Sequence, residues 1–299
     1  MAKVTKAVIA AAGFGTRFLP QTKAMPKEML PLIDKPIIQY VVEDLVEAGI
    51  KDIIIIGSSN KRAIEDHFDL PNEDLLANLR AGGPSKQKYI DAMERLASMA
   101  NFIYLRQKGP YGTATPLMNA ASLLGNEPFI YTYPDDLTIA SPNTFQQLIS
   151  IYEEFNAGVD SCFDIYEDFE YDRYGIAAGE EVRPGLLRMS GIAEKPGREQ
   201  APSNFASTGT RLFADGKIFE YLERGLQNLP EGKEFQITSE AVEPMLKDGI
   251  PMYAYSIQNA KRYDTGTQIE YLKTLFSFAL RHQDLGEELR EYLRGELSE

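Results

Sequence analysis

Short apolar runs alternate with amphipathic segments along the first part of the chain. Residues 7–12 form an apolar run that ends at Gly13, which is typical of a buried parallel strand. Apolar residues then recur at helical spacing across residues 37–46, and residues 52–57 form a second apolar run. This succession of strand, helix and strand predicts the beginning of a doubly wound sheet.

The remaining elements follow from the same periodicities and from helix boundary residues. Further strands are expected at residues 102–107, 129–133, 159–165, 174–177, 186–194, 205–213 and 252–256. Further helices are expected at residues 59–68, 75–79, 87–99, 115–125, 141–155, 217–224, 239–247, 267–282 and 285–293. The alternation of strand and helix weakens after residue 167, so we expect an α/β fold whose later part is richer in strands.

Several polar residues are expected to cap these helices. They are Asp34, the pair Ser59-Asn60, Thr115, and Thr267 in a capping box with Glu270. The polar segment 71–100 departs from the strand–helix alternation. We expect its charges to form a solvated face, with a cover over a site as the alternative.

Cationic side chains follow the first predicted strand at close spacing. Gly13 and Gly15 allow backbone N–H groups to approach a ligand, and Arg17, Lys23 and Lys27 add positive charge beside them. This combination favours a polyphosphate-binding loop. A glycine pair alone is a common turn, the third glycine of a dinucleotide fingerprint is replaced by phenylalanine, and the Gly-Lys-Ser/Thr of a P-loop is absent.

Three strand ends are expected to meet at one crevice. They are residues 13–17, 107–112 and 135–136, and ligands of open parallel sheets bind beyond the carboxyl ends of the strands. Asp135 is a candidate Mg²⁺ ligand, because this ion takes one or two carboxylates together with phosphate oxygens. A turn or a helix cap is an equal alternative for this residue.

Two further charged positions have simple local explanations. Asp264 begins an Asp-x-Gly turn, which is favoured over metal binding on its local sequence alone. Lys195 follows Glu194 at the end of a predicted strand, where an exposed charge pair before a turn is the commoner arrangement.

Composition restricts the class of protein. The chain has 299 residues and a net charge of −13, which argues against nucleic acid or an anionic membrane as a partner. The single cysteine excludes an internal disulfide framework and suits a reducing cytoplasm. Two histidines leave little room for histidine-based metal sites or catalytic triads. The first apolar run is too short for a signal peptide, and we expect one compact cytoplasmic body.

The order G-x-G-T-R-x-x-P-x-T-K-x-x-P-K-E-M-L-P at residues 13–31 resembles the signature of bacterial UTP–glucose-1-phosphate uridylyltransferases. The similarity extends in order from about residue 3 to about residue 293. It implies a single nucleotidyltransferase domain over residues 1–299, with a mostly parallel, Rossmann-like and glycosyltransferase-A-like sheet. The nucleotide-binding portion would cover about residues 1–165, the sugar-binding portion about 166–266, and C-terminal helices about 267–299.

The resemblance also implies roles for individual residues, with Mg²⁺ as the cofactor and UTP and a sugar 1-phosphate as substrates. Catalytic roles are implied for Arg17, Lys27 and Lys195. Nucleotide binding is implied for Ala11, Ala12, Gly13, Gly15, Thr16, Glu28, Gln107 and Gly112. Sugar binding is implied for Gly175, Glu194 and Gly209, and metal binding for Asp135 and Asp264. The family suggests a homo-oligomer, either a dimer or a tetramer.

Three motifs depart from the family pattern. The usual Gly-x-Gly-His-Ala is replaced at residues 111–115, Glu-Ile-Gln-Leu-Thr-Asp loses its final acid at residues 234–239, and Gly-Arg-Tyr is changed at residues 208–211. Residues 264–267 look more like the glucose-1-phosphate thymidylyltransferases. The alternatives are therefore a thymidylyltransferase, a uridylyltransferase for another sugar 1-phosphate, or a non-catalytic regulatory paralogue that binds nucleotide sugars.

Overall fold

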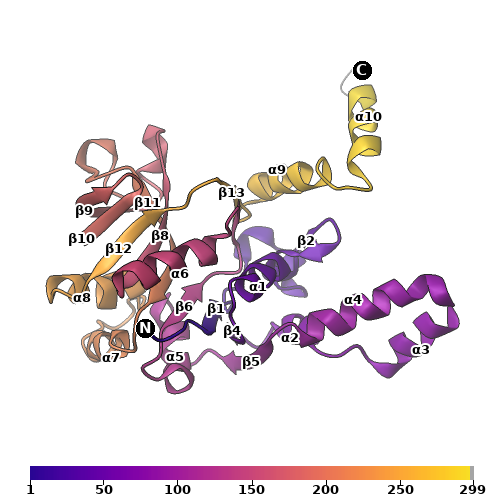
Figure 1. Cartoon of the computed structure of the whole chain (residues 1–299), viewed down its shortest axis with the longest axis horizontal. Helices are drawn as coiled ribbons and strands as arrows, with labels where there is room; N and C mark the ends of the chain where they lie inside the picture. The colour runs from indigo at the N-terminus through magenta and orange to yellow at the C-terminus, as the bar shows by residue number, and fades with distance from the viewer. Residues whose placement is uncertain (297–299) are drawn as a thin grey trace.

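A computed structural model describes residues 1–296, apart from the side chain of Asp136. A nine-stranded sheet forms its centre (Figure 1). In spatial order the strands are β5 (Asn101–Arg106), β4 (Asp52–Gly57), β1 (Lys6–Ala10), β6 (Phe129–Thr132), β11 (Phe205–Phe213), β8 (Gly158–Asp164), β12 (Met252–Ser256), β10 (Leu186–Glu194) and β9 (Gly175–Arg183).

The sheet has a parallel half and a mixed half. Strands β5, β4, β1 and β6 are parallel neighbours, as expected from the early alternation of strand and helix. Strand β11 runs antiparallel to both β6 and β8, and β10 pairs antiparallel with β12 and β9. The α/β fold with a later, strand-rich part is therefore confirmed, and β8 and β12 form a parallel pair within the mixed half of the sheet.

Helices cover both faces of the sheet, which explains why the parallel strands are apolar on both sides. Val8 and Ile54 point into one apolar cluster, and Ile9 and Ile55 point into the cluster on the opposite face. The first cluster is completed by α5 (Ala114–Leu124), α7 (Ile218–Gln227) and α8 (Glu243–Lys247). The second is completed by α1 (Ile37–Glu47), α2 (Arg62–Phe68) and α6 (Thr144–Phe155).

Helix starts differ from the sequence-based expectation. Neither Asp34 nor Ser59-Asn60 is a cap, because α1 begins after Pro36 and α2 after Lys61, both without a side-chain cap. The Thr115 hydroxyl instead donates to the carbonyl of Pro110 at 2.6 Å. Helix α6 begins at Thr144 rather than at residue 141, with a capping box between Asn143 and Gln146.

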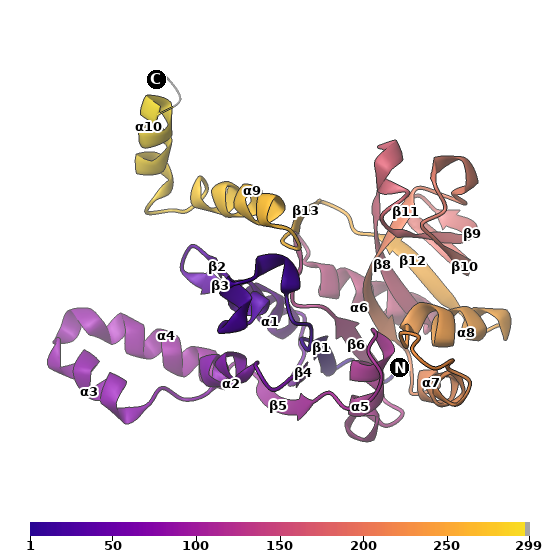
Figure 2. The ribbon, with the colours of Figure 1, turned by 180° about the vertical axis from the view of Figure 1, so that it is seen from behind.

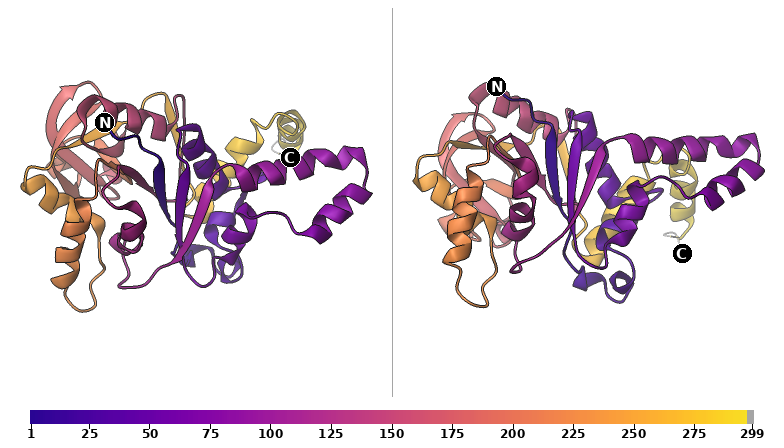
Figure 3. Two further views of the ribbon diagram at one scale, coloured as in Figure 1. Left: turned by 60° about the horizontal axis from the view of Figure 1, so that its bottom comes forward. Right: turned by 90° about the horizontal axis from the view of Figure 1, so that it is seen from below.

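One helical hairpin projects from the body in all ribbon views (Figures 1, 2 and 3), and the C-terminal end of the chain extends away from the body in Figures 1 and 2. Helices α3 (Glu73–Ala81) and α4 (Gln87–Ser98) form a hairpin that reaches outward beyond α2 and the edge strand β5. The C-terminal helices are α9 (Gln268–Ala279) and α10 (Gly286–Glu296). Thr267 caps α9 by accepting from Glu270 N as expected, whereas the Glu270 carboxylate pairs with Lys273 and does not complete the expected capping box. Among residues 1–296, no helix has both the length and the apolar character needed to cross a membrane.

Two small antiparallel sheets and several short helical turns were not expected from the sequence. The small sheets pair β2 (Pro31–Leu32) with β3 (Lys35–Pro36), and β7 (Asp136–Ala140) with β13 (Ala260–Asp264). The 3-10 turns are Thr16–Phe18, Gln21–Lys23, Lys27–Met29, Pro84–Lys86, Asp168–Glu170 and Arg198–Gln200. The helix expected at residues 239–247 instead begins as a π-helical turn, Thr238–Val242, and continues as α8. The β7–β13 ribbon brings residue 264 next to residue 136, far away in the chain.

Candidate active site

The loop after β1 is shaped by Gly15 and stabilised by Thr22. Gly15 has a left-handed backbone with φ 63°, and a Cβ atom there would lie 3.0 Å from Cβ of Lys27. Glycine therefore satisfies the backbone conformation and lets the stem of Lys27 pass close to the loop. The Thr22 hydroxyl donates to the carbonyl of Gly15 at 2.8 Å, which ties the start of the loop to its later part.

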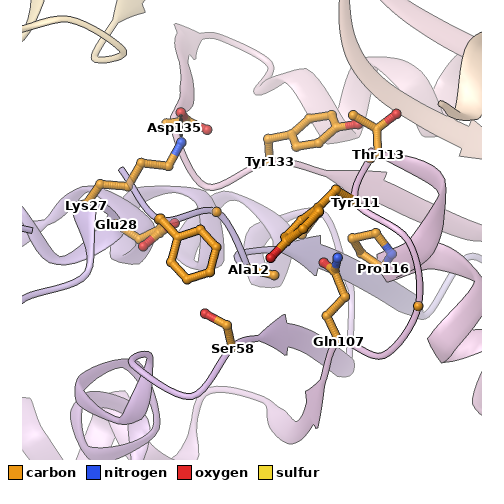
Figure 4. A pocket seen from close by; sticks show the side chains of 15 residues that line it. Ala12, Lys27, Glu28, Ser58, Gln107, Tyr111, Thr113, Pro116, Tyr133 and Asp135 are labelled. Atoms are coloured by element: carbon orange, nitrogen blue, oxygen red, sulfur yellow. Dashed lines mark hydrogen bonds and ion pairs between the residues drawn. The ribbon is translucent and has the colours of Figure 1, made fainter. Parts of the chain in front are cut away.

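The first cavity has a volume of about 400 Å³ and lies at the carboxyl ends of the parallel strands (Figure 4). All three predicted strand ends contribute to it. Seven of the residues implied by the family resemblance line it, namely Ala12, Gly13, Lys27, Glu28, Gln107, Gly112 and Asp135. The close-up shows Lys27 on one side of this cavity and Gln107 and Tyr111 on the other.

Lys27 and Asp135 form an ion pair at the edge of this cavity. Nζ of Lys27 lies 2.5 Å from Oδ2 of Asp135, and about a quarter of each side chain is exposed. Burial lowers the pKa of Lys27, but the charge of Asp135 and the hydrogen bond to it outweigh burial, so the pKa is raised. The ammonium group therefore stays charged and accessible to a phosphate.

A second ion pair, between Glu28 and Lys61, lies fully inside the protein. Nζ of Lys61 lies 2.7 Å from Oε2 of Glu28, and the two side chains are 3% and 0% exposed. Burial raises the pKa of Glu28 and lowers the pKa of Lys61, and their mutual attraction opposes both shifts. Sequence reasoning missed Lys61, although its spacing to the buried Ile64 and Phe68 places it on the inner face of α2.

The loop that carries Gly112 packs directly on a distant segment. Gly112 has φ 133°, and a Cβ atom there would lie 2.1 Å from the carbonyl oxygen of Phe235. The backbone of Phe235 accepts from Ala114 at 2.9 Å and donates to Tyr111 at 2.7 Å. The cavity wall around Gly112 thus depends on a glycine and on Phe235, which sequence reasoning did not single out.

A second cavity of about 260 Å³ adjoins the first, since Thr113 and Tyr133 line both. All three implied sugar-binding residues line it, and they come from β9, β10 and β11. They are Gly175, Glu194 and Gly209. In the left-handed conformation of Gly209, with φ 86°, a Cβ atom would lie 2.9 Å from the Tyr133 ring.

A buried charge pair supports the second cavity. Arg211 lines this cavity and is almost fully buried, with its Nε 3.2 Å from Oδ1 of Asp160. The same carboxylate oxygen accepts from the Ser207 hydroxyl at 3.0 Å, and Arg211 donates to Thr238 at 3.2 Å. Burial raises the pKa of Asp160 against the opposing charge of Arg211. The sequence marked Arg211 only as a departure from the family motif.

Lys195 and Arg17 lie outside the lining of these two cavities. Lys195 has a left-handed backbone with φ 47°, which is uncommon for a residue with a side chain, and its N–H donates to the carbonyl of Tyr174. Its ammonium lies 3.9 Å from Glu194. Nη1 of Arg17 donates to the carbonyl of Gly266 at 3.4 Å, so it extends toward the Asp264 turn.

The Asp264 turn lies at the same end of the sheet as Asp135. Asp264 pairs with residue 136 across the β7–β13 ribbon, and the Thr265 hydroxyl donates to the carbonyl of Asp135 at 3.2 Å. Oδ1 of Asp264 accepts from Gly266 N at 2.7 Å, as the alternative Asp-x-Gly interpretation expects. Of the remaining implied residues, Ala11, Gly15 and Thr16 belong to the loop but do not line either cavity.

The donor set fits a hard divalent cation that is partly held by substrate. Asp135 presents a carboxylate at the cavity edge, and the β7–β13 ribbon brings Asp264 close to it. Within the described part of the chain, no three His, Cys, Asp or Glu side chains are grouped to hold a metal by themselves. Mg²⁺ typically binds one or two carboxylates and completes its shell with water and phosphate oxygens.

Comparison with known proteins shows the family of the chain. The family model described as Nucleotidyl transferase matches residues 6–278. UTP–glucose-1-phosphate uridylyltransferase 1 of Staphylococcus saprophyticus is 41% identical over 292 residues, which cover 98% of each chain. The uridylyltransferase of Bacillus subtilis is 39% identical over 298 residues, which cover 100% of this chain and 99% of that protein.

Solved structures with the same overall fold include two with bound ligands. A UDP-glucose pyrophosphorylase complexed with UDP-glucose superposes with a TM-score of 0.81 at 32% identity, covering 94% of this chain and 100% of the other. A UTP-bound enzyme from Acinetobacter baumannii superposes with a TM-score of 0.84 at 33% identity, covering 97% and 99%. The chain therefore belongs to the nucleotidyl transferase family and is an enzyme of that family.

Proposed function

We propose that this enzyme transfers UMP from UTP to glucose 1-phosphate, giving UDP-glucose and pyrophosphate with Mg²⁺ as the cofactor. The observation that carries the proposal is the pair of adjoining cavities that share Thr113 and Tyr133. The first cavity joins the Lys27 ammonium and the backbone of Gly13 and Gly112 to Gln107, groups that suit a nucleoside triphosphate, and the second places Glu194 among polar groups. The names of the relatives, which match over nearly the whole chain, support the same pair of substrates.

The reaction is an in-line displacement at the α-phosphorus of UTP. A phosphate oxygen of the sugar 1-phosphate forms the new P–O bond, the bond to the β-phosphate breaks, and pyrophosphate leaves with the electron pair. Such reactions depend on positioning and charge stabilisation more than on acid–base groups. In the proposed roles, Lys27 and Arg17 bind the β- and γ-phosphates, and Lys195 binds the sugar phosphate.

Asp135 and Asp264 would hold Mg²⁺ in this scheme. When bound, the ion reduces the repulsion between the two anionic substrates. Lys27 contacts the same carboxylate, so it can turn from Asp135 to a phosphate oxygen when the nucleotide enters. The chain's own residues therefore supply positive charge on the leaving-group side without a histidine.

Pyrophosphate release provides the test. The enzyme is supplied with Mg²⁺ and glucose 1-phosphate, and UTP, dTTP, ATP, CTP and GTP are compared as second substrate. Strong release with UTP alone supports the proposal, and release with dTTP alone would reassign the base. Absence of release with every nucleotide, together with tight binding of UDP-glucose, would identify a regulatory paralogue instead.

A uridylyltransferase for another sugar 1-phosphate is the second candidate. All three motifs that depart from the family pattern contribute to the second cavity, through Thr113, Thr208, Arg211 and the segment 236–238. The first cavity has only residues 111–113 from those motifs. Galactose and N-acetylglucosamine 1-phosphates, offered with UTP in the same assay, separate this candidate from the first.

A further inference from the structure

The buried pair of Glu28 and Lys61 leaves one carboxylate oxygen uncommitted. Oε2 of Glu28 accepts from Lys61 at 2.7 Å, whereas Oε1 is buried and has no hydrogen-bond partner among the described residues. Glu28 lines the first cavity, but Lys61 does not. A buried acceptor without a donor is unfavourable, and a ligand that supplies an N–H or O–H group would satisfy it.

The Lys61 side chain extends from a closely packed turn at residues 57–61. Gly57 allows its stem to pass close by, because a Cβ atom at Gly57 would lie 3.1 Å from Cβ of Lys61. The backbone N–H of Lys61 donates to Ser58, and its carbonyl accepts from Ile64 at 2.9 Å. Ser58 in the same turn lines the cavity, so the turn forms part of the wall and also fixes the buried ammonium.

We infer that Lys61 is a positioning residue for the nucleotide, acting through Glu28, an inference that rests on the proposed function. Its ammonium engages Oε2 and holds the carboxylate in place, with Oε1 available to a donor group of the nucleoside. Without Lys61, Glu28 either takes up a proton or leaves its buried position. The first outcome removes the negative charge of the acceptor, and the second removes its fixed position at the cavity.

Lys61 also contributes to the net charge of the cavity wall beside the expected triphosphate, and this charge affects nucleotide binding. Lys27 adjoins Glu28 in the chain and pairs with Asp135, so two cations and two carboxylates alternate across this wall. Loss of Lys61 alone leaves a net negative wall if Glu28 stays ionised, and that charge repels a triphosphate. Both effects weaken nucleotide binding and leave the second cavity unchanged.

A double-mutant cycle tests whether Lys61 acts through Glu28. We expect Lys61→Met to raise KM for UTP about tenfold, the scale of a lost positioning contact. In a Glu28→Gln background the same substitution should change KM for UTP by less than about twofold, since the group it positions is already altered. KM for the sugar 1-phosphate should stay within about twofold in all variants.

Controls separate this role from a purely structural one. Arg62→Met removes the neighbouring, solvent-exposed cation and should leave both KM values unchanged. Lys61→Arg restores the charge and should recover part of the UTP affinity. The Glu28→Gln/Lys61→Met double variant replaces both buried charges by neutral groups, so it remains measurable if the single variant does not fold.

Calorimetric titration of UTP gives an answer that does not depend on turnover. If Lys61→Met lowers thermal stability but binds UTP like the wild-type protein, the inference is wrong and the pair serves folding alone. An equal effect in both Glu28 backgrounds also contradicts it.

Titration with dUTP identifies the nucleoside group that donates to Glu28. If that group is the ribose 2′-hydroxyl, Lys61→Met should not change the affinity for dUTP, whereas another nucleoside donor would preserve the effect of the substitution. Failure of the proposed function would instead appear in the wild-type protein, as absent pyrophosphate release.

Discussion

Lys27 is the cation that the structure ties most closely to the candidate metal ligand, since it pairs with Asp135 at the cavity edge. Lys27→Ala should lower kcat about 10²-fold or more, because in the proposed reaction it removes a charge that stabilises the leaving pyrophosphate. Steady-state pyrophosphate release measures this. Lys51→Ala is the control, because Lys51 is an exposed cation just before β4 and lines neither cavity. Near-normal turnover of the Lys27 variant would refute its assignment.

Gly112 is required by both its backbone conformation and its contact with Phe235. Gly112→Ala should destabilise the protein by about 2–3 kcal/mol and distort the wall of the first cavity, since a side chain is strained there. Chemical denaturation and KM for UTP measure the two effects. Gly191→Ala is the control, because no atom lies within 4 Å of a Cβ atom at that position and its φ is ordinary. Equal stability of the two variants would contradict the argument.

The sequence alone was sufficient to predict which residues of the first loop lie at the cavity, because their sequence motif is continuous. Lys27 and Glu28 lie in one continuous motif, and Asp135 follows a recognisable strand. The contacts of Lys61 and Arg211 could not be predicted, since each depends on a buried partner far away in the chain. A charged residue at an inward-facing position was the available signal in both cases.

At the scale of one element, α1 carries three acids in its C-terminal half. Burial, followed by the charges of Glu47 and Glu43, raises the pKa of Asp44 to about 7. The folded protein therefore binds this proton more tightly than the unfolded chain does. The stabilising effect of protonation is present below pH 7, grows as the pH falls toward the ordinary value near 4, and is lost as the pH rises through 7.

Asp44→Asn should consequently stabilise the protein at pH 8, by about 2 kcal/mol after allowance for partial exposure. This advantage should shrink or reverse at pH 5, where the native carboxyl is already neutral. Thermal unfolding at both values measures the difference. Asp66→Asn, at an exposed acid of α2, should show no such change with pH. A constant difference between wild type and Asp44→Asn would contradict the raised pKa.

Elements with strong periodicity were predicted with correct bounds, as β10, β11 and β12 demonstrate. Helix starts were predicted less well, because a polar residue before an apolar run is compatible with several caps. The β7–β13 ribbon was missed, since its strands are short and partly polar and they stabilise each other only by pairing over a long separation. That ribbon brings Asp264 to the site.

At the scale of the whole molecule, α9 exposes three large apolar side chains on one face, Ile269, Leu272 and Phe276. Their spacing of three and four residues forms a stripe, and the opposite face packs on the body through Tyr271 and Phe278. A homo-oligomer would cover this stripe. Leu272→Ser combined with Phe276→Ser should then shift the protein toward the monomer in analytical ultracentrifugation. Glu270→Gln is the control, and an unchanged mass would exclude this face.

The order of strands in the sheet could not be obtained from local patterns. Strand β11 enters between β6 and β8, although about seventy residues separate it from β6, and that insertion joins the two cavities. Local propensity specifies which segments are strands, but long-range packing decides which strands become neighbours. The sequence indicated a crevice at the strand ends and did not indicate that Thr113 and Tyr133 would border both cavities.

The boundary between β6 and β11 allows the first and the second cavity to change largely independently during evolution. The loop after β1 carries the sequence that resembles the family signature, whereas all three motifs that depart from the family pattern contribute residues to the second cavity. A change of sugar specificity could therefore arise in the second cavity with few changes in the first, where only residues 111–113 belong to the altered motifs. Thr113 borders both cavities, so a substitution there would be expected to affect nucleotide binding as well as sugar binding.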